Sequence, residues 1–231
     1  MIPLNDTEPN RYTSFPFMTV TLIIINVFMF IAQDLVLESS LESYLKLIYV
    51  YGSVPVLVLN EEGGGALSAI TQMFMHGGLL HLGGNMLALW VFGRRVEDVT
   101  GPWRFLAFYL AAGLFADIIS TISRFNSDIP GIGASGAIYG VMAAYLIIFP
   151  KGRIRTLVFL SFVPLWLKLR AYWVILYFVL LQIPLAFQVL LFGAESSVAY
   201  WAHLGGFFGG LFIFFFLRPD AFHRYRNDLP L

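Results

Sequence analysis

The sequence has no cysteine among its 231 residues, so disulfide bonds, thiol nucleophiles and iron–sulfur ligation are excluded. Charged residues are scarce as well, at 12%, which is about half the fraction of an ordinary soluble domain. The formal net charge is zero, so nothing suggests a nucleic-acid partner. Hydrophobic residues instead make up 58% of the chain, with 23 Phe and a mean hydropathy of +0.77. This composition predicts a polytopic helical membrane protein.

Apolar segments long enough to cross a bilayer recur along the whole chain. We therefore expect an all-α fold in which six transmembrane helices form one membrane domain over residues 1–231, without a soluble domain. The predicted spans cover about residues 17–33, 79–96, 103–123, 132–149, 173–191 and 198–217.

Three connecting segments need separate treatment. Residues 1–15 form a polar head too short to fold alone. Residues 34–75 are too apolar for a solvated loop and too broken by Gly and Pro to span, which predicts a long interfacial loop of short helices between the first two spans. Residues 156–167 are apolar but short, and we interpret them as a re-entrant or interfacial piece.

The basic residues predict the orientation of the spans. If the N-terminus lies inside, every Lys and Arg except Lys46 and Arg124 falls on the inner side. Lys and Arg concentrate in cytoplasmic loops, so both termini are expected to be cytoplasmic. An extra span at residues 156–167 would spoil this asymmetry, which supports the count of six.

Polar residues gather near the outer ends of the second, fourth and sixth spans, which all run from outside to inside. The second span carries His81 and Asn85, the fourth Ser135 and Tyr139, and the sixth His203. Polar groups within spans are costly and by default indicate function. The expected depths of these residues would allow them to meet in one pocket below the outer surface.

Small residues recur every four positions on the fourth and sixth spans, and such stripes let two helices approach closely. The stripes are Gly136, Gly140 and Ala144 on one span and Ala202, Gly206 and Gly210 on the other. Close packing would bring His203 within hydrogen-bond reach of Ser135, which is the arrangement that a serine nucleophile needs to lose its proton.

Each of these signals alone has an ordinary structural explanation. A serine in a membrane helix usually bonds a carbonyl group one turn away, and a His–Asn pair can join two helices. A metal site made of His76, His81 and His203 is a chemical alternative. It lacks an HExxH motif and any nearby carboxylate except Asp117, so we expect neither a metal nor a cofactor.

Taken together, three motifs on alternate spans are specific: HGGLLHLGGN, GASGAIYG and AHLGGFFGG. In this order they resemble the rhomboid family of intramembrane serine proteases, in the minimal six-span, bacterial-type form. The resemblance covers about residues 71–215. One departure is that Leu67 and Ser68 stand where many members have a Trp-Arg pair.

The resemblance implies a role for each motif residue. Ser135 would be the nucleophile and His203 the general base. The expected supporting residues are His81 and Asn85, with the Ser135 amide, for the oxyanion hole, Tyr139 stacked on His203, Gly133 in the turn before the nucleophile, and His76 supporting from the loop. For Asp117, a carboxylic acid that is paired with a hydroxyl group or kept neutral in the bundle is favoured over a third catalytic role.

The resemblance implies a serine endopeptidase that cleaves single-span, membrane-anchored proteins near the outer face of the bilayer. We expect a multi-pass protein of the cell (inner) membrane, in contact with lipid. The alternative is a catalytically weak rhomboid-like binding protein that captures transmembrane clients. A transporter is disfavoured because no internal repeat is visible.

Overall fold

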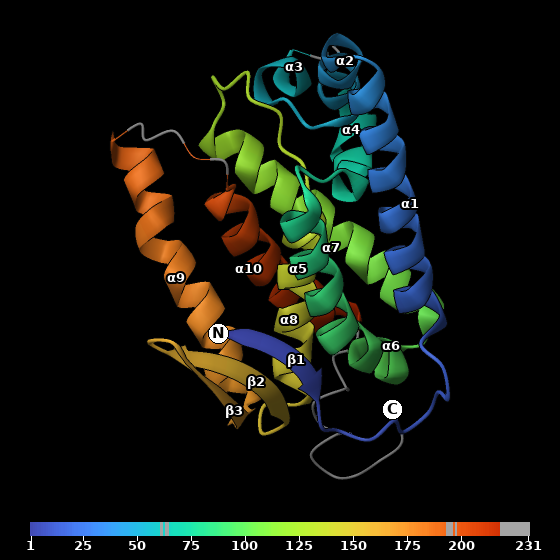
Figure 1. Ribbon diagram of the computed structural model, residues 1–231, viewed down its shortest axis with the longest axis vertical. Helices are drawn as coiled ribbons and strands as arrows, with labels where there is room; N and C mark the ends of the chain where they lie inside the picture. Colours follow the sequence, from blue (N-terminus) through green and yellow to red (C-terminus); the bar gives the residue numbers. More distant parts are fainter. Residues whose placement is uncertain (61, 63–64, 193–195, 197, 218–231) are drawn as a thin grey trace.

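The computed structural model describes residues 1–60, 62, 65–192, 196 and 198–217 (Figure 1). The protein is mostly helical, as predicted. Its helices are α1 (Phe17–Ser39), α2 (Leu41–Tyr51), α3 (Pro55–Leu59), α4 (Gly65–Thr71), α5 (Leu79–Ala88), α6 (Arg94–Thr100), α7 (Pro102–Ser123), α8 (Ser135–Ile148), α9 (Ala171–Phe192) and α10 (Tyr200–Leu217). A 3-10 turn, η1 (Gln72–Phe74), precedes α5, and a π-helical stretch, η2 (Leu89–Gly93), joins α5 to α6.

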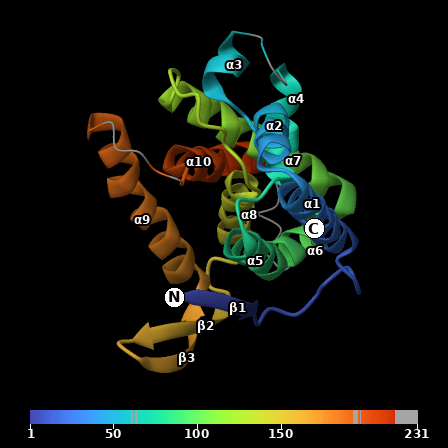
Figure 2. The ribbon, with the colours of Figure 1, turned by 45° about the horizontal axis from the view of Figure 1, so that its top comes forward.

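Within the described residues, three helices, α1, α7 and α9, are long and apolar enough to cross a membrane. Helices α8 and α10 are apolar but shorter. Each of the six predicted segments contains a helix, and α5, η2 and α6 together occupy the second segment as a continuous run. The connection at residues 34–75 forms the short helices that were expected, α2 to α4, which cap one end of the molecule (Figures 1 and 2).

Helix α8 lies in the middle of the bundle and packs against α7 and α10. The small-residue stripes face each other across the contact with α10, as predicted. A Cβ atom placed on Gly210 would lie 2.5 Å from the Cα atom of Gly140, and one on Gly206 would overlap the carbonyl oxygen of Gly136. Only glycine allows this approach of two backbones, and the approach brings the motifs around Ser135 and His203 together.

The prediction of an all-α fold is wrong, because a three-stranded antiparallel sheet lies at the end opposite α2 to α4 (Figure 1). Its strands are β1 (Ile2–Asp6), β2 (Arg153–Leu160) and β3 (Val163–Arg170), in the order β1-β2-β3. The segment interpreted as a re-entrant or interfacial piece is thus the β2–β3 hairpin. It is rich in β-branched and aromatic residues, and its two-residue loop is entered through Ser161, whose φ of 56° suits a tight hairpin turn.

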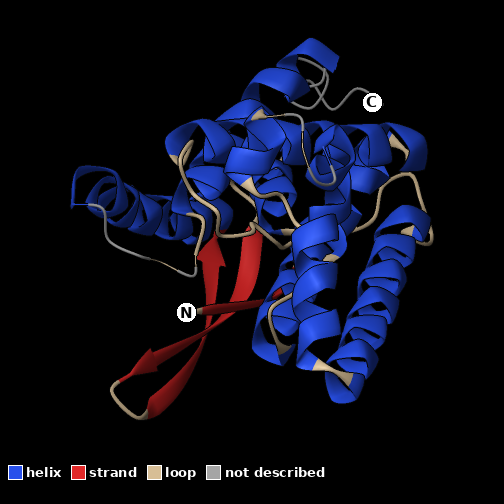
Figure 3. Ribbon diagram, turned by 90° about the horizontal axis from the view of Figure 1, so that it is seen from above, coloured by secondary structure: helices blue, strands red, loops and turns tan. Residues whose placement is uncertain are grey.

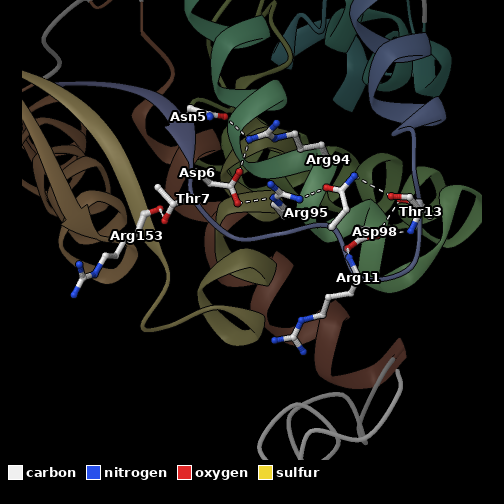
Figure 4. A network of polar contacts seen from close by, with 10 residues as sticks. Asn5, Asp6, Thr7, Arg11, Thr13, Arg94, Arg95, Asp98 and Arg153 are labelled. Atoms are coloured by element: carbon white, nitrogen blue, oxygen red, sulfur yellow. Dashed lines mark hydrogen bonds and ion pairs between the residues drawn. The ribbon is translucent and has the colours of Figure 1, made fainter.

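The polar head gains its structure from the bundle (Figure 4). Asp6, at the end of β1, is buried and accepts hydrogen bonds from Arg94 and from Nε of Arg95, the latter at 2.6 Å. A buried carboxylate between two guanidinium groups keeps its charge compensated. Because β1 pairs with β2, the N-terminal strand and the basic β2–β3 hairpin lie at the same end of the molecule. The C-terminus lies outside the described residues.

Two carboxylates of α6, Glu97 and Asp98, hold the chain that leads into α1. Asp98 accepts hydrogen bonds from the backbone N–H groups of Tyr12 and Thr13 (2.9 and 2.6 Å; Figure 4). Glu97 accepts the backbone N–H groups of Met18 and Thr19, each at 2.7 Å. The first N–H groups of a helix have no intrahelical acceptor, so Glu97 caps α1 from another helix.

Candidate active site

The predicted nucleophile and base are brought together by the contact between α8 and α10. Ser135 is the first residue of α8 and His203 lies in the first turn of α10. Their Oγ and Nε2 atoms are 2.8 Å apart, although the two residues are separated by 68 positions in the sequence. Both side chains are half-buried. A serine hydroxyl group can therefore donate its hydrogen directly to an imidazole nitrogen here.

The other ring nitrogen of His203 identifies the tautomer. Nδ1 lies 2.8 Å from Oε1 of Gln182, on α9. The amide nitrogen of Gln182 donates to the carbonyl oxygen of Phe178 at 3.0 Å, which fixes Oε1 as the atom facing the ring. A carbonyl oxygen only accepts, so Nδ1 carries the hydrogen and Nε2 is left as the acceptor for Ser135.

Tyr139 covers one face of the His203 ring. The two rings are stacked, with centroids 4.5 Å apart and an interplanar angle of 9°. Tyr139 lies one turn after Ser135, and its hydroxyl group donates to the Phe178 carbonyl oxygen at 3.4 Å. The imidazole is thus held in its plane by Tyr139 and along its edge by Gln182.

Gly133 shapes the turn in front of the nucleophile. Its φ of 125° is a conformation that side-chain-bearing residues rarely adopt, and its N–H group donates to the Gln72 carbonyl oxygen at 2.9 Å. A Cβ atom on Gly133 would lie 2.8 Å from Nε2 of His81 and 3.8 Å from Nδ2 of Asn85. These two polar groups of α5 therefore converge on the backbone just before Ser135.

Hydrogen bonds orient both of these groups. Nδ1 of His81 accepts the Gly77 N–H group at 3.4 Å, which leaves the hydrogen on Nε2, on the edge of the ring that faces Gly133. Nδ2 of Asn85 lies 3.0 Å from Nε2 of His76. An amide nitrogen has two hydrogens, so Asn85 can donate one to His76 and keep the other for the site.

His76, in the connection before α5, is buried and supports the site from behind. Its backbone N–H and C=O groups both bond the side-chain amide of Gln33 on α1, at 3.1 and 3.2 Å. Burial, and to a lesser extent the nearby His81, lower the pKa of His76 to about 4. His76 is therefore neutral at physiological pH and available as an acceptor for Asn85.

The comparisons with known proteins show the family of this chain. Residues 64–220, more than half of the chain, match the family model described as a rhomboid domain. The chain belongs to the rhomboid family. Its relatives include the Bacillus subtilis rhomboid protease GluP, at 34% identity over 62% of this chain and 24% of that protein. The RHOMBOID-like protein 5 of Arabidopsis thaliana is 30% identical over 69% of this chain and 47% of that protein.

A mitochondrial relative, rhomboid protein 1 of Saccharomyces cerevisiae, is 36% identical over 40% of this chain and 28% of its own length. The chain spans less than half the length of each of these relatives. Rhomboid family members are typically serine proteases, and the homologues at about 30–36% identity include proteins named as rhomboid proteases.

The structure brings all seven predicted site residues of this rhomboid domain to one region and adds Gln182, which sequence reasoning missed. The available signal was an amide in the apolar run of α9, which carries Gln182 and Gln188. Asp117 is not the partner of His203, because Gln182 accepts the Nδ1 hydrogen. The carboxyl group of Asp117 lies near the Ser53 hydroxyl group and Arg124 instead. Among the described residues, no cluster of three or more His, Asp or Glu side chains could hold a metal ion.

The long connection is anchored without the Trp-Arg pair that many rhomboids have there. The hydroxyl group of Thr71, at the end of α4, donates to the carbonyl oxygen of Tyr51 at the end of α2, at 2.7 Å. Ser68 stands in the same helix and is buried. A hydrogen bond between α2 and α4 thus fixes the end of α4, and the next residue, Gln72, accepts the Gly133 N–H group.

Proposed function

We propose that this rhomboid is an intramembrane serine endopeptidase that cleaves peptide bonds with a Ser135–His203 dyad. One observation carries the proposal: Ser135 Oγ lies 2.8 Å from Nε2 of His203, and the other ring nitrogen, Nδ1, is hydrogen-bonded to Gln182. This combination gives a hydroxyl donor, an unprotonated acceptor and a fixed ring. It meets the geometric requirement for an activated serine nucleophile.

In the first half of the reaction, Ser135 Oγ attacks the scissile carbonyl carbon while its proton moves to Nε2 of His203. The resulting imidazolium is stabilised by the hydrogen bond from Nδ1 to Gln182 and by the stacked ring of Tyr139. The tetrahedral intermediate then collapses, the C–N bond breaks, and the Nε2 proton goes to the leaving amine. The product is an ester between Ser135 Oγ and the carbonyl carbon at the new end of the N-terminal substrate fragment.

The negative charge of the tetrahedral oxygen needs donors that are already in place. The backbone N–H group of Ser135 lies at the N-terminus of α8, where N–H groups lack intrahelical acceptors and the helix dipole favours negative charge. Nε2–H of His81 and the second hydrogen of Asn85 approach from α5. Together these three groups form the proposed oxyanion hole.

In the second half, a water molecule attacks the ester carbon while His203 Nε2 accepts a proton from it. The same three donors stabilise the second tetrahedral intermediate. Its collapse breaks the bond to Ser135 Oγ, which regains its proton from Nε2. The carboxylate product leaves and the dyad returns to its starting state.

The proposed substrates are membrane-anchored proteins with a single span, cut near the outer face of the bilayer. Ser135 begins α8, whose other end leads into the basic hairpin, so the site is at the outer end of this helix if the basic residues are inside. A substrate helix must unwind locally, because its carbonyl groups are hydrogen-bonded in lipid. This proposal includes a single six-span membrane domain with both termini cytoplasmic, in the cell (inner) membrane and in contact with lipid.

The test uses purified protein in liposomes together with a generic single-span substrate. Wild type is expected to cleave it, and Ser135→Ala and His203→Ala are expected to abolish cleavage with nearly unchanged melting temperatures. A fluorophosphonate reagent should label wild type and leave Ser135→Ala unlabelled. Cleavage that persists in Ser135→Ala would remove the assignment. Substrate capture without cleavage or labelling in wild type would favour the alternative, a rhomboid-like binding protein.

A further inference from the structure

The hairpin of β2 and β3 concentrates positive charge on one face. Its register pairs Arg153 with Arg170 and Arg155 with Lys168. Directly opposed residues in an antiparallel pair lie on the same face, and like charges in such pairs destabilise the hairpin. All four side chains are exposed. None of them forms a side-chain hydrogen bond or ion pair with another described residue.

The same face becomes aromatic toward the hairpin loop. The next opposed pairs are Leu157 with Trp166 and Phe159 with Pro164. Trp166 is 71% exposed, and Phe162, in the loop, is 98% exposed. An exposed aromatic tip next to a cluster of cations is the combination that interfacial membrane-binding elements use, because aromatic rings and long basic side chains both partition to the headgroup layer.

The chain connectivity places this face at the membrane border. The hairpin joins the apolar helix α8 to α9, a span-length apolar helix, and the N–H group of Ala171 bonds the carbonyl oxygen of Gly152 at 2.7 Å to close its base. Its tip extends past the helices instead of packing on them (Figure 3). In a bilayer, a two-stranded arm that leaves the bundle at the level of the helix ends would meet the lipid headgroups next to the protein.

The neighbouring strand does not supply the missing negative charge. In β1, Asn5 pairs with Arg155 and Ile2 with Leu157, so an amide and an apolar side chain extend the face. The acidic residue of β1, Asp6, pairs with Ile154 and is turned to the bundle arginines. Among the described residues, the cationic cluster is thus left without acidic partners.

We propose that the β2–β3 hairpin is a binding site for anionic phospholipids, with Arg153, Arg155, Lys168 and Arg170 on the headgroups and the aromatic tip in the interface. Each basic side chain near an anionic leaflet adds about a fivefold preference, so four add up to several hundredfold. The site is separate from the dyad and requires only that the rhomboid domain is embedded in a bilayer. Its test therefore does not depend on proteolysis.

The absence of cysteine makes the test specific. Phe162→Cys gives a single attachment point for an environment-sensitive fluorophore at the tip. In nanodiscs with one protein each, discs that contain phosphatidylglycerol should shift the emission to the blue and allow quenching by lipids brominated on their acyl chains. Phosphatidylcholine discs, with or without added inorganic phosphate, should show a smaller shift. Equal emission in both lipids would overturn the proposal, and a shift produced by inorganic phosphate alone would indicate a soluble anion instead of a lipid.

Charge variants in the same background identify the groups that bind. Arg155→Gln should reduce the preference for the anionic lipid roughly fivefold, and replacing all four cations with Gln should abolish it. Arg104→Gln, at an exposed arginine at the start of α7, is the matched control and should change nothing. Melting temperatures check that each variant is folded. A preference for the anionic lipid that survives replacement of all four cations would refute the assignment. A blue shift found only in discs that hold two copies would also refute it, because it would indicate pairing of two chains through the free edge of β3.

Discussion

Gln182 provides the sharpest test of the proposed mechanism, because it touches His203 but not the substrate in the first step. Its Oε1 atom accepts the Nδ1 hydrogen at 2.8 Å. Gln182→Met keeps the length and the buried position of the side chain but removes the acceptor. The imidazole then has no group to fix its tautomer, and the imidazolium formed during attack loses a charge-assisted hydrogen bond.

The size of the effect follows from that single bond. Hydrogen bonds to charged groups contribute about 1.5–3 kcal/mol. The positive charge on His203 develops only as the proton leaves Ser135, so the loss falls on the transition state and not on substrate binding. We therefore expect kcat to fall roughly 10- to 150-fold in Gln182→Met with KM nearly unchanged.

Two further variants separate positioning from a merely structural role. Gln182→Glu should recover most of the loss, because a carboxyl oxygen can still accept the Nδ1 hydrogen. Gln188→Met, six residues further along α9 at an exposed position, should have wild-type kinetics. The assay is the initial rate of cleavage in liposomes over a range of substrate concentrations, with melting temperature as the folding control. An unchanged kcat in Gln182→Met, or a loss confined to KM, would refute the positioning role.

Three other changes test the rest of the site and the fold. Asn85→Ala should lower kcat by about 10²–10³ while leaving measurable cleavage; a rise in KM at constant kcat would mean that Asn85 binds substrate instead. Gly206→Val should force α10 away from the Gly136 carbonyl group, lowering the melting temperature and cleavage together, and a fully stable and active variant would contradict this contact. Glu97→Gln should weaken the cap of α1 by about 1–2 kcal/mol, seen as a lower melting temperature with normal turnover per folded molecule; an unchanged melting temperature would exclude the cap.

The helices of the bundle were predictable because lipid imposes a simple rule. Every backbone polar group in a span must be satisfied internally, so a long apolar run is a helix. The approach of α8 and α10 was predictable for a related reason, since Gly136, Gly140, Gly206 and Gly210 leave no side chains between the two backbones. The distance between Ser135 and His203 follows from that contact.

The sheet was not predictable by the same rule. The apolar run at residues 156–167 is short, and a short run does not distinguish a strand from a buried helical piece. The strand that completes the sheet, β1, lies at the other end of the sequence and pairs through Ile2 and Asp6 with Leu157 and Ile154. Such a pairing is decided by which surfaces the folded bundle presents, and the local sequence of β1 carries no signal for it.

Gln182 and Gln33 show where sequence reasoning ends inside the bundle. Both are buried amides in apolar helices, and the cost of an unsatisfied amide in lipid predicts that each has a partner. It does not predict which one: Gln33 bonds the backbone of His76, whereas Gln182 bonds the ring of His203. The partner depends on the rotation of α1 and α9 about their own axes, and their apolar surroundings specify that rotation only weakly. A polar side chain within a span therefore identifies a candidate, and the packing of its neighbours decides whether it holds a loop or orients a catalytic base.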